Sequence, residues 1–453
     1  MTTPTVEQTP PSRSAAGHRR VALALALLAM ALLGPAVARQ DASSWSRTAL
    51  TGGVVEDWTV DLEDFPIGVD RVVYDGEIRS DKAPGQPVFA APFHAVYRAF
   101  GGESAKVERA HENLGLWWQT LWVSAVPFAG LLALMYLAAS RVDRRTALPA
   151  AFAVGFGTLM LPFADHLYGH ILSALAVFAS WLLVRERPSP RAALAAGALA
   201  GFAAITEYQV ALVVVIVGGA LALHARDRLM PFVLGGAPFA VFAGVYHWIV
   251  VGNPLRVPYS LKDVHEGGIV GISFPQPEHL LEIGVGDRGL LVATPIVVLA
   301  VGAAVVLARE PGPWRRDASV ALASFVTLVC VQAGGSMPPW GGESPGPRYV
   351  VAAMPFLAVP LAASWSRLRP LTPLVAAWSV AVMLLPTFTQ PLLDNRASAI
   401  PTWIRLAGRG EFTPTIFSMA AGSVGVVVHL LLVMAAGAYL VREARVAAVE
   451  MGS

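Results

Sequence analysis

The sequence predicts an all-α, polytopic membrane protein with about twelve transmembrane helices and a long extracytoplasmic first loop that carries interfacial helices. Three observations support this fold class. The 453 residues are 55% hydrophobic and only 14% charged, whereas soluble domains are roughly 45–50% apolar and about 25% charged. The apolar residues gather in runs of membrane-spanning length. Arginines mark every second connection between these runs.

Composition excludes several other classes of protein. The 33 Lys and Arg residues nearly balance the 31 Asp and Glu residues, so the net charge of +2 does not favour a nucleic-acid partner. The single cysteine, Cys330, cannot form a disulfide within the chain or a CxxC redox pair. No glycine-rich phosphate loop is present, which argues against a nucleotide-sugar donor.

Apolar runs define the predicted spans. Several are rich in Ala and Gly, which lets helices approach closely within a bilayer. The twelve spans are 20–38, 115–139, 147–164, 167–184, 191–206, 208–223, 229–251, 289–308, 318–334, 349–365, 371–388 and 415–441.

Arginine placement predicts the orientation. Arg19 and Arg20 precede the first span, and arginines recur after the second, fourth, sixth, eighth, tenth and twelfth spans. Because basic residues accumulate in cytoplasmic loops, we expect both terminal tails, 1–19 and 442–453, in the cytoplasm of a plasma-membrane protein. The longer extracytoplasmic loops are then 39–114, 252–288, 335–348 and 389–414.

The first span has a second interpretation. Its basic start, its short apolar stretch and the sequence Ala36-Val37-Ala38 also fit a cleaved signal peptide. Cleavage would leave the following loop outside in either case, so the sequence leaves both interpretations open.

The first extracytoplasmic loop holds most of the outer carboxylates. A carboxylate at the mouth of a membrane cavity can act as a general base on an acceptor hydroxyl. It can equally bind a divalent cation, so the metal requirement stays open. Asp41 follows the first span directly, which fixes its depth in the bilayer. We therefore treat Asp41 as the leading candidate for a functional carboxylate.

Residues 74–85 are the most informative segment of the chain. Asp75-Gly76 predicts a turn, and Pro84 prevents a helix from continuing through Lys82. An apolar stretch, 87–100, follows at the expected membrane interface. A lysine at this depth can bind a phosphate as a point charge, or it can snorkel beside an interfacial helix.

The segment Asp-Lys-Ala-Pro-Gly at 81–85 resembles the first-loop motif of the GT-C superfamily of membrane glycosyltransferases. It is similar to the Lys-x-Pro motif of the glycosyltransferase 39 group, which includes protein O-mannosyltransferases and the aminoarabinose lipid A transferase. The chain looks closest to actinobacterial polytopic proteins of the mannosyltransferase-like type. Three further segments support the resemblance: Gly-Asn-Pro at 252–254, Gly-Asp-Arg-Gly at 286–289 and Trp-Gly-Gly-Glu-Ser-Pro-Gly-Pro-Arg-Tyr at 340–349.

The resemblance implies a donor sugar on a polyprenyl phosphate, an acidic base in the first extracytoplasmic loop and basic residues that hold the phosphate. Carried over to this chain, it implies that Asp41 is the base and that Lys82 contacts the donor phosphate. Arg348 would be a second phosphate or sugar contact.

The chain departs from the family pattern at the base. Many members have two adjacent acidic residues at this position, whereas Asp41 stands between Gln40 and Ala42. Asp70 and Glu56 therefore remain alternates for the base.

Other polar residues lie near the predicted outer ends of the spans. Arg288 is placed much as Lys82 and Arg348 are, so it is a third candidate for the donor phosphate. Residues that either line a cavity or belong to polar turns and the aromatic belt are Asp165, His166, His170, Glu207, Tyr246, His247 and Trp340. Residues interpreted as loop surface are Lys262, Asp263, His265, Glu266, Glu278, His279 and Glu282.

We therefore expect an integral membrane glycosyltransferase. It would move a sugar from a polyprenyl-phosphate donor to an extracytoplasmic glycan, lipid or protein of the cell envelope. The alternative is a transporter or flippase of a lipid-linked precursor, which would use the same cavity and cations without breaking a bond.

Overall fold

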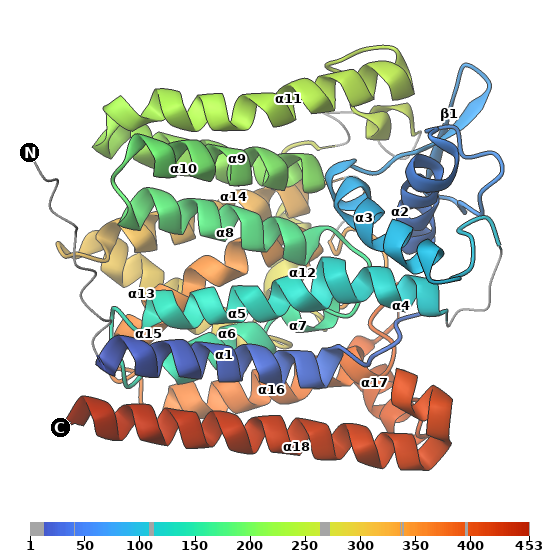
Figure 1. Ribbon diagram of the computed structural model, residues 1–453. Coiled ribbons are helices and arrows are strands. Elements are labelled where there is room, and N and C mark those ends of the chain that lie inside the picture. The colour runs from blue at the N-terminus through green and yellow to red at the C-terminus, as the bar shows by residue number, and fades with distance from the viewer. Residues whose placement is uncertain are drawn as a thin grey trace, which may run out of the picture.

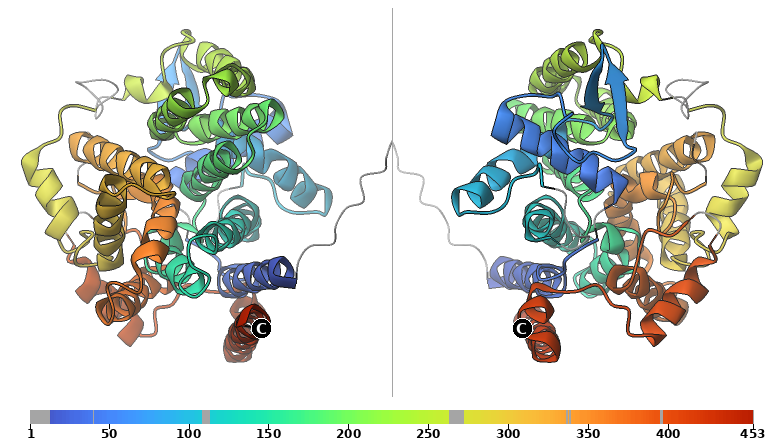
Figure 2. Two further views of the ribbon diagram at one scale, coloured as in Figure 1. Left: turned by 90° about the vertical axis from the view of Figure 1, so that its left-hand side faces the viewer. Right: turned by 90° about the vertical axis from the view of Figure 1, so that its right-hand side faces the viewer.

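A computed structural model describes residues 13–39, 41–107, 113–262, 272–335, 337, 339–394 and 397–452, so Asp263, His265 and Glu266 lie outside the described residues. Long helices run side by side (Figure 1), and the end-on views show them gathered into one bundle (Figure 2). The bundle helices are α1 (Arg13–Leu33), α5 (Val126–Ala139), α6 (Ala147–Phe156), α8 (His170–Glu186), α9 (Pro190–Thr206), α10 (Ala211–His224), α11 (Leu229–Val251), α13 (Pro295–Arg309), α14 (Arg315–Gly334), α15 (Ala358–Ser364), α16 (Leu371–Phe388) and α18 (Ile416–Gly452).

Every predicted span overlaps at least one of these helices. In the described part of the chain, six helices are long and apolar enough to cross a membrane, and five further apolar helices are 10–17 residues long. The helical membrane class is therefore confirmed, and the count of twelve transmembrane helices stays a prediction.

Several predicted spans are not single α-helices, and the third and the tenth are examples. In the third span, α6 ends at Phe156 and the short helix α7 (Met160–Phe163) follows. The tenth span begins as the 3₁₀ helix η7 (Arg348–Leu357) and continues as α15. Pro355 lies inside η7. Because proline lacks a backbone N–H, it cannot complete the α-helical hydrogen-bond pattern at this point.

Small residues bring α9 and α11 into close contact, as the Ala- and Gly-rich composition predicts. A Cβ atom added at Gly197 would lie 1.8 Å from the carbonyl oxygen of Phe232. One added at Gly235 would lie 2.0 Å from the carbonyl oxygen of Leu194. Backbones this close leave no space for any side chain, which is the small-residue packing typical of membrane helices.

The start of α1 and the end of α18 lie at the same end of the bundle, opposite the first loop (Figure 1). The Arg20 guanidinium lies 3.1 Å from a carboxylate oxygen of Glu443 and 2.7 Å from one of Glu450. This agrees with both ends of the chain lying on one side, and the cytoplasmic assignment of that side stays a prediction.

The first loop folds into α2 (Ala42–Gly52), the π-helix η1 (Gly53–Asp57), the strands β1 (Arg71–Tyr74) and β2 (Glu77–Ser80), and α3 (Gly85–Ala99). The predicted turn is confirmed: Asp75 and Gly76 both have positive φ and join the antiparallel strands. Two such residues match the twist of a tight hairpin. The fold is therefore helical with one added hairpin, which corrects the all-α prediction.

The remaining elements connect or cap the bundle. They are α4 (Leu114–Thr120), η2 (Leu121–Ala125), η3 (Tyr208–Val210), η4 (Arg226–Arg228), η5 (Pro258–Leu261), α12 (Pro277–Val285) and α17 (Ala399–Gly408).

Candidate active site

A cavity of about 840 Å³ opens between the first loop and the ends of several bundle helices. Its charged end is lined by Arg47 of α2, His170 at the start of α8, Glu207 after α9 and Arg348 at the start of η7. Apolar side chains form most of the remaining wall, among them Leu212, Val257, Phe274 and Val331. The cavity thus suits a ligand with one anionic part and one apolar part.

Arg348 is the cation in this cavity that has no hydrogen-bond partner among the described residues. Its Nε is buried without a partner, and its guanidinium contacts the rings of Tyr168 and Tyr349, with centroid distances of 5.9 and 5.7 Å. A planar guanidinium with free N–H groups is well shaped to bind a phosphate in bidentate fashion.

The Trp-Gly-Gly motif explains how Arg348 is held. Gly341 and Gly342 have φ of +85° and +98°, a conformation that side chains rarely adopt. A Cβ atom at Gly341 would lie 2.9 Å from the Nε of Arg348. On the next residue, the N–H of Tyr349 donates to the side-chain oxygen of Gln332 at 2.9 Å. The glycine turn therefore lies directly against the guanidinium.

Arg47 and Glu207 form an ion pair beside Arg348, and the His170 ring lies next to it. The Nη2 of Arg47 donates to Oε1 of Glu207 at 3.0 Å, and Nδ1 of His170 lies 3.5 Å from the same oxygen. Burial favours the neutral acid, but His170 and Arg47 hold the pKa of Glu207 below its usual value. The ion pair anchors the first loop to the bundle, because Arg47 and Glu207 come from α2 and from the end of α9.

Tyr168 lies at the centre of the charged end. Its ring is 5.2 Å from the guanidinium carbon of Arg47 and stacks on His170 with centroids 5.5 Å apart. Its hydroxyl donates to Oδ1 of Asp41 at 3.2 Å. Tyr168 thus contacts cations of the cavity and the leading candidate base at once.

Asp41 caps α2 beside the cavity. Its carboxylate accepts hydrogen bonds from the backbone N–H groups of Ser43 and Ser44, at 2.7 and 3.1 Å, and from the hydroxyl of Ser44 at 2.6 Å. Asp41 is not in the cavity lining, but its neighbours Ser43 and Tyr168 are. The cap and Tyr168 together fix the orientation of this carboxylate.

Lys82 is saturated with oxygen partners. Its Nζ lies 2.7 Å from Asp70, 3.1 Å from Asp81 and 3.2 Å from the hydroxyl of Tyr259. Lys262 bridges the same two carboxylates, at 3.2 Å from Asp70 and 2.7 Å from Asp81. Because the ammonium already has two carboxylates and a hydroxyl within 3.2 Å, a phosphate would have to displace one of them.

The contacts of Lys82 and Asp70 explain the directions in which their pKa values shift. Burial disfavours the charged amine, yet the facing oxygens of Tyr259, Asp81 and Asp70 hold the pKa of Lys82 above its usual value. Burial also disfavours the charged form of Asp70, yet Lys82 and Lys262 hold the pKa of that carboxyl well below its usual range. Lys82 and Asp70 therefore both stay charged around neutral pH.

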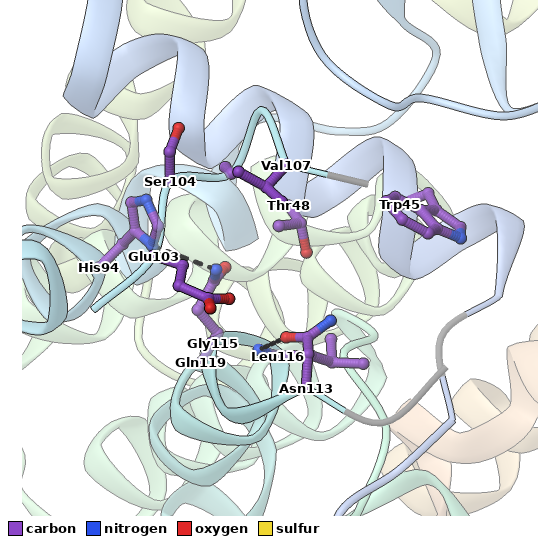
Figure 3. Close-up of a pocket in the computed structure, with 11 residues that line it drawn as sticks. Trp45, Thr48, His94, Glu103, Ser104, Val107, Asn113, Gly115, Leu116 and Gln119 are labelled. Carbon is purple, nitrogen blue, oxygen red and sulfur yellow. Dashed lines mark hydrogen bonds between the residues drawn. The ribbon is translucent and has the colours of Figure 1, made fainter. Parts of the chain in front are cut away.

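Glu56 belongs to a different place in the first loop. It contacts Nε2 of His94 at 2.7 Å, the backbone N–H of Ala105 at 2.9 Å and the hydroxyl of Ser104. His94 and Ser104 line a small separate pocket of about 20 Å³, shown in Figure 3. That volume holds about one water molecule. Glu56 is not in the lining of the large cavity.

Arg288 makes structural contacts instead of facing the cavity. Its guanidinium donates to the backbone carbonyls of Ser344, Leu393, Asp394 and Ala397 at 2.5–3.1 Å. It is almost fully buried, and its hydrogen bonds join three segments that are far apart in the sequence.

The expected cavity-lining residues separate into two groups. His170 and Glu207 lie in the lining. The other expected residues are not in the lining. Asp165 and His166 pair with each other at 2.6 Å, and His247 shares a hydrogen bond with the Tyr208 hydroxyl at 2.9 Å. The Tyr246 hydroxyl donates to the Lys82 carbonyl at 3.4 Å, and the Trp340 carbonyl accepts from the Arg348 N–H at 3.4 Å.

Sequence reasoning missed several residues of this region. Tyr168 and Arg47 were not proposed as site residues, Asp81 was quoted only as part of a motif, and Lys262 was interpreted as loop surface. Arg47 lies six positions after Asp41, and residues six apart do not share one face of a helix, so this spacing did not indicate that the two belong to one site. The described residues contain no group of three His, Cys, Asp or Glu side chains that could hold a metal ion.

By sequence, the chain matches no family model and no curated protein. By structure, it resembles ArnT from Cupriavidus metallidurans bound to undecaprenyl phosphate, with a TM-score of 0.52 and 15% identity over 96% of this chain and 76% of the other. It also resembles the Archaeoglobus fulgidus oligosaccharyltransferase tethered with an acceptor peptide, with a TM-score of 0.50 and 13% identity over 88% of this chain and 55% of the other.

Both relatives are membrane glycosyltransferases of the GT-C superfamily. Identities this low compare folds and not activities. The match to ArnT covers 96% of this chain, so it includes most of the bundle and most of the first loop. The chain therefore shares the fold of these two proteins, which is the GT-C fold expected from the sequence.

Proposed function

We propose that the chain is an integral membrane glycosyltransferase that transfers a sugar from a polyprenyl-phosphate donor to an extracytoplasmic acceptor in the cell envelope. The observation that carries this proposal is the guanidinium of Arg348, which has no hydrogen-bond partner in the described part of the chain and lies at the charged end of an otherwise apolar cavity. The GT-C fold supports it, because one relative of the same fold was captured with undecaprenyl phosphate.

In this proposal the donor lies along the cavity. Its phosphate binds Arg348, with Arg47 close by, and its prenyl chain follows the wall that includes Leu212 and Phe274. The bond between the anomeric carbon and the phosphate oxygen breaks in the reaction, so negative charge grows on the phosphate. Fixed guanidinium groups stabilise that charge without reorganisation.

Asp41 is the proposed base. Its carboxylate takes the proton of the acceptor hydroxyl while the acceptor oxygen bonds to the anomeric carbon, and polyprenyl phosphate leaves. Asp41 suits this role better than the two alternates because Asp70 is paired with two lysines and Glu56 lies at another pocket.

The relative weight of the two cations changes from the sequence-based expectation, which gave Lys82 the main phosphate contact and Arg348 a supporting one. We assign the main contact to Arg348, because Lys82 is occupied by Asp70, Asp81 and Tyr259. Lys82 then acts mainly by fixing the first loop near the cavity.

Transfer from labelled polyprenyl-phosphate sugars by purified protein tests the proposal. Asp41→Asn should abolish transfer while α2 persists, because asparagine caps helices as well as aspartate does. Asp64→Asn, an exposed carboxylate of the same loop, is the matched control and should stay active. Arg348→Ala should raise the donor KM strongly, whereas the exposed Arg405→Ala should not.

Two outcomes would count against the proposal. Full activity of Asp41→Asn would remove the base assignment. Movement of the lipid-linked sugar across vesicles without transfer would favour a flippase, which needs the cations and not the carboxylate.

A further inference from the structure

A second cavity, of about 570 Å³, opens at the other end of the bundle. It is lined by the connection between α5 and α6, by the last turns of α13 and by the segments that flank α14 and α15. Trp314 lines it just before α14, and Val331 lines the candidate active site near the other end of that helix. A helix of 20 residues is about 30 Å long, so the two cavities are well separated.

Three arginines line this cavity: Arg144, Arg145 and Arg367. Among the described residues, the guanidinium groups of Arg144 and Arg145 have no hydrogen-bond or ion-pair partner. The single acidic residue in the lining, Asp143, accepts a hydrogen bond from the backbone N–H of Arg145 at 2.9 Å. The lining therefore carries an excess of positive charge.

In the described part of the chain, one acidic side chain pairs with these arginines, and that ion pair is weak. Arg367 lies 3.7 Å from Glu310, and both side chains are more than half exposed, at 65% and 53%. Ion pairs this exposed contribute little and exchange readily with other charges. Arg367 is thus available to a ligand that carries its own anion.

Apolar side chains form the rest of the wall. Leu307 and Ala363 lie in the last turns of α13 and α15, Val142 lies in the connection after α5, and Trp314 lies just before α14. Tryptophan at the end of a membrane helix is typical of the headgroup level of a bilayer. The cavity therefore combines arginines with an apolar wall at the depth where lipid headgroups and acyl chains meet.

We propose that this cavity binds the phosphate headgroup of an anionic glycerophospholipid from the leaflet at that end of the bundle. Guanidinium groups form strong charge-assisted hydrogen bonds with phosphate oxygens. Basic pockets between membrane helices recognise anionic headgroups in the same way. The volume lies within the range of roughly 300–1,000 Å³ that holds small organic ligands. A soluble phosphate would use the arginines but would gain nothing from Leu307 and Ala363.

Binding to delipidated, full-length protein in detergent tests this inference, with phosphatidylglycerol as the probe and phosphatidylcholine as the neutral comparison. Native mass spectrometry counts the lipids bound. The triple variant Arg144→Ala, Arg145→Ala, Arg367→Ala should lose affinity for phosphatidylglycerol by about tenfold or more, because each basic residue near an anionic lipid strengthens its binding. Binding of phosphatidylcholine should not change.

The matched control removes three exposed arginines from the neighbouring connections α8–α9 and α10–α11: Arg187→Ala, Arg191→Ala and Arg226→Ala. It should bind phosphatidylglycerol like the wild type. Equal losses in both triple variants would mean general charge attraction and would overturn the proposal. Competition by soluble glycerol phosphate at the same concentration as the lipid would also overturn it. If the cavity triple fails to fold, Arg144→Gln and Arg145→Gln singly should each weaken binding.

Discussion

The hydroxyl of Tyr168 donates a hydrogen bond to Oδ1 of Asp41 at 3.2 Å. The ring of the same tyrosine contacts the guanidinium groups of Arg47 and Arg348, with centroid distances of 5.2 and 5.9 Å. One side chain therefore joins the proposed base to the proposed phosphate site. The position of the carboxylate and the positions of the cations are not independent.

Tyr168→Phe should lower kcat by about tenfold, because a hydrogen bond to a charged group contributes about 1.5–3 kcal/mol and the ring is kept. The donor KM should change little, since the contacts with Arg47 and Arg348 remain. Tyr168→Ala should lower kcat and raise the donor KM together. Steady-state kinetics with varied donor separates the two effects. Identical kinetics of the phenylalanine variant and the wild type would exclude a positioning role for the hydroxyl.

Gly341→Ala should weaken donor binding indirectly, by displacing Arg348. Its φ of +85° makes alanine unfavourable by about 1–2 kcal/mol, and the new Cβ would lie 2.9 Å from Nε of Arg348. We expect a lower Tm and a higher donor KM. Gly437→Ala is the matched control, because a Cβ atom there meets nothing within 4 Å and helix propensity improves. A normal donor KM in Gly341→Ala would show that the turn does not position Arg348.

The bundle could be predicted from the sequence because each helix that crosses a bilayer needs an apolar run of membrane-spanning length. Each apolar run overlaps a bundle helix, and the arginine pattern agrees with the ends of α1 and α18 lying together. The hairpin β1–β2 was missed although its turn was predicted at Asp75-Gly76. A two-stranded hairpin is stabilised by contacts with the loop around it, and the hydropathy of the sequence does not reveal these contacts.

The candidate site was harder to predict, because charge partners in a folded loop are not visible in sequence order. Lys82 and Lys262 are 180 positions apart and share the same two carboxylates. A sequence pattern identifies each lysine as a free cation. Only the fold distinguishes the saturated Lys82 from the unpaired Arg348, and that distinction changes which residue is assigned to the phosphate.

Lys82→Met should destabilise the protein by about 3 kcal/mol, the range expected when one partner of a buried ion pair is removed. The lowered pKa of Asp70 contributes stability above its unfolded value of about 3.9, and this contribution is lost as the pH falls below it. The raised pKa of Lys82 contributes stability below about 10.4, and this is lost at higher pH. The difference in Tm between variant and wild type should therefore be largest between these two values.

Thermal unfolding in detergent from pH 3 to pH 10.5 measures this difference. Lys106→Met provides the control, because Lys106 is a half-buried lysine of the same loop whose ion pair with Asp57 is open to solvent and contributes little. It should leave Tm unchanged at every pH. A difference for Lys82→Met that does not shrink as the pH falls below about 4 would show that its carboxylate partners do not carry the effect.

Arg288→Lys should unfold the protein at a lower temperature and leave the donor KM of the folded fraction unchanged. The guanidinium donates to four backbone carbonyls, and a lysine cannot reach all of them with one ammonium group. Leaving buried carbonyls unpaired costs about 1–3 kcal/mol each, so a loss of several kcal/mol is expected. Arg348→Lys should behave in the opposite way, with Tm preserved and the donor KM raised, because Arg348 has no hydrogen-bond partner to lose among the described residues. Comparison of the two variants shows which of the two arginines contacts the donor phosphate. A raised donor KM at unchanged Tm in Arg288→Lys would return the phosphate contact to Arg288.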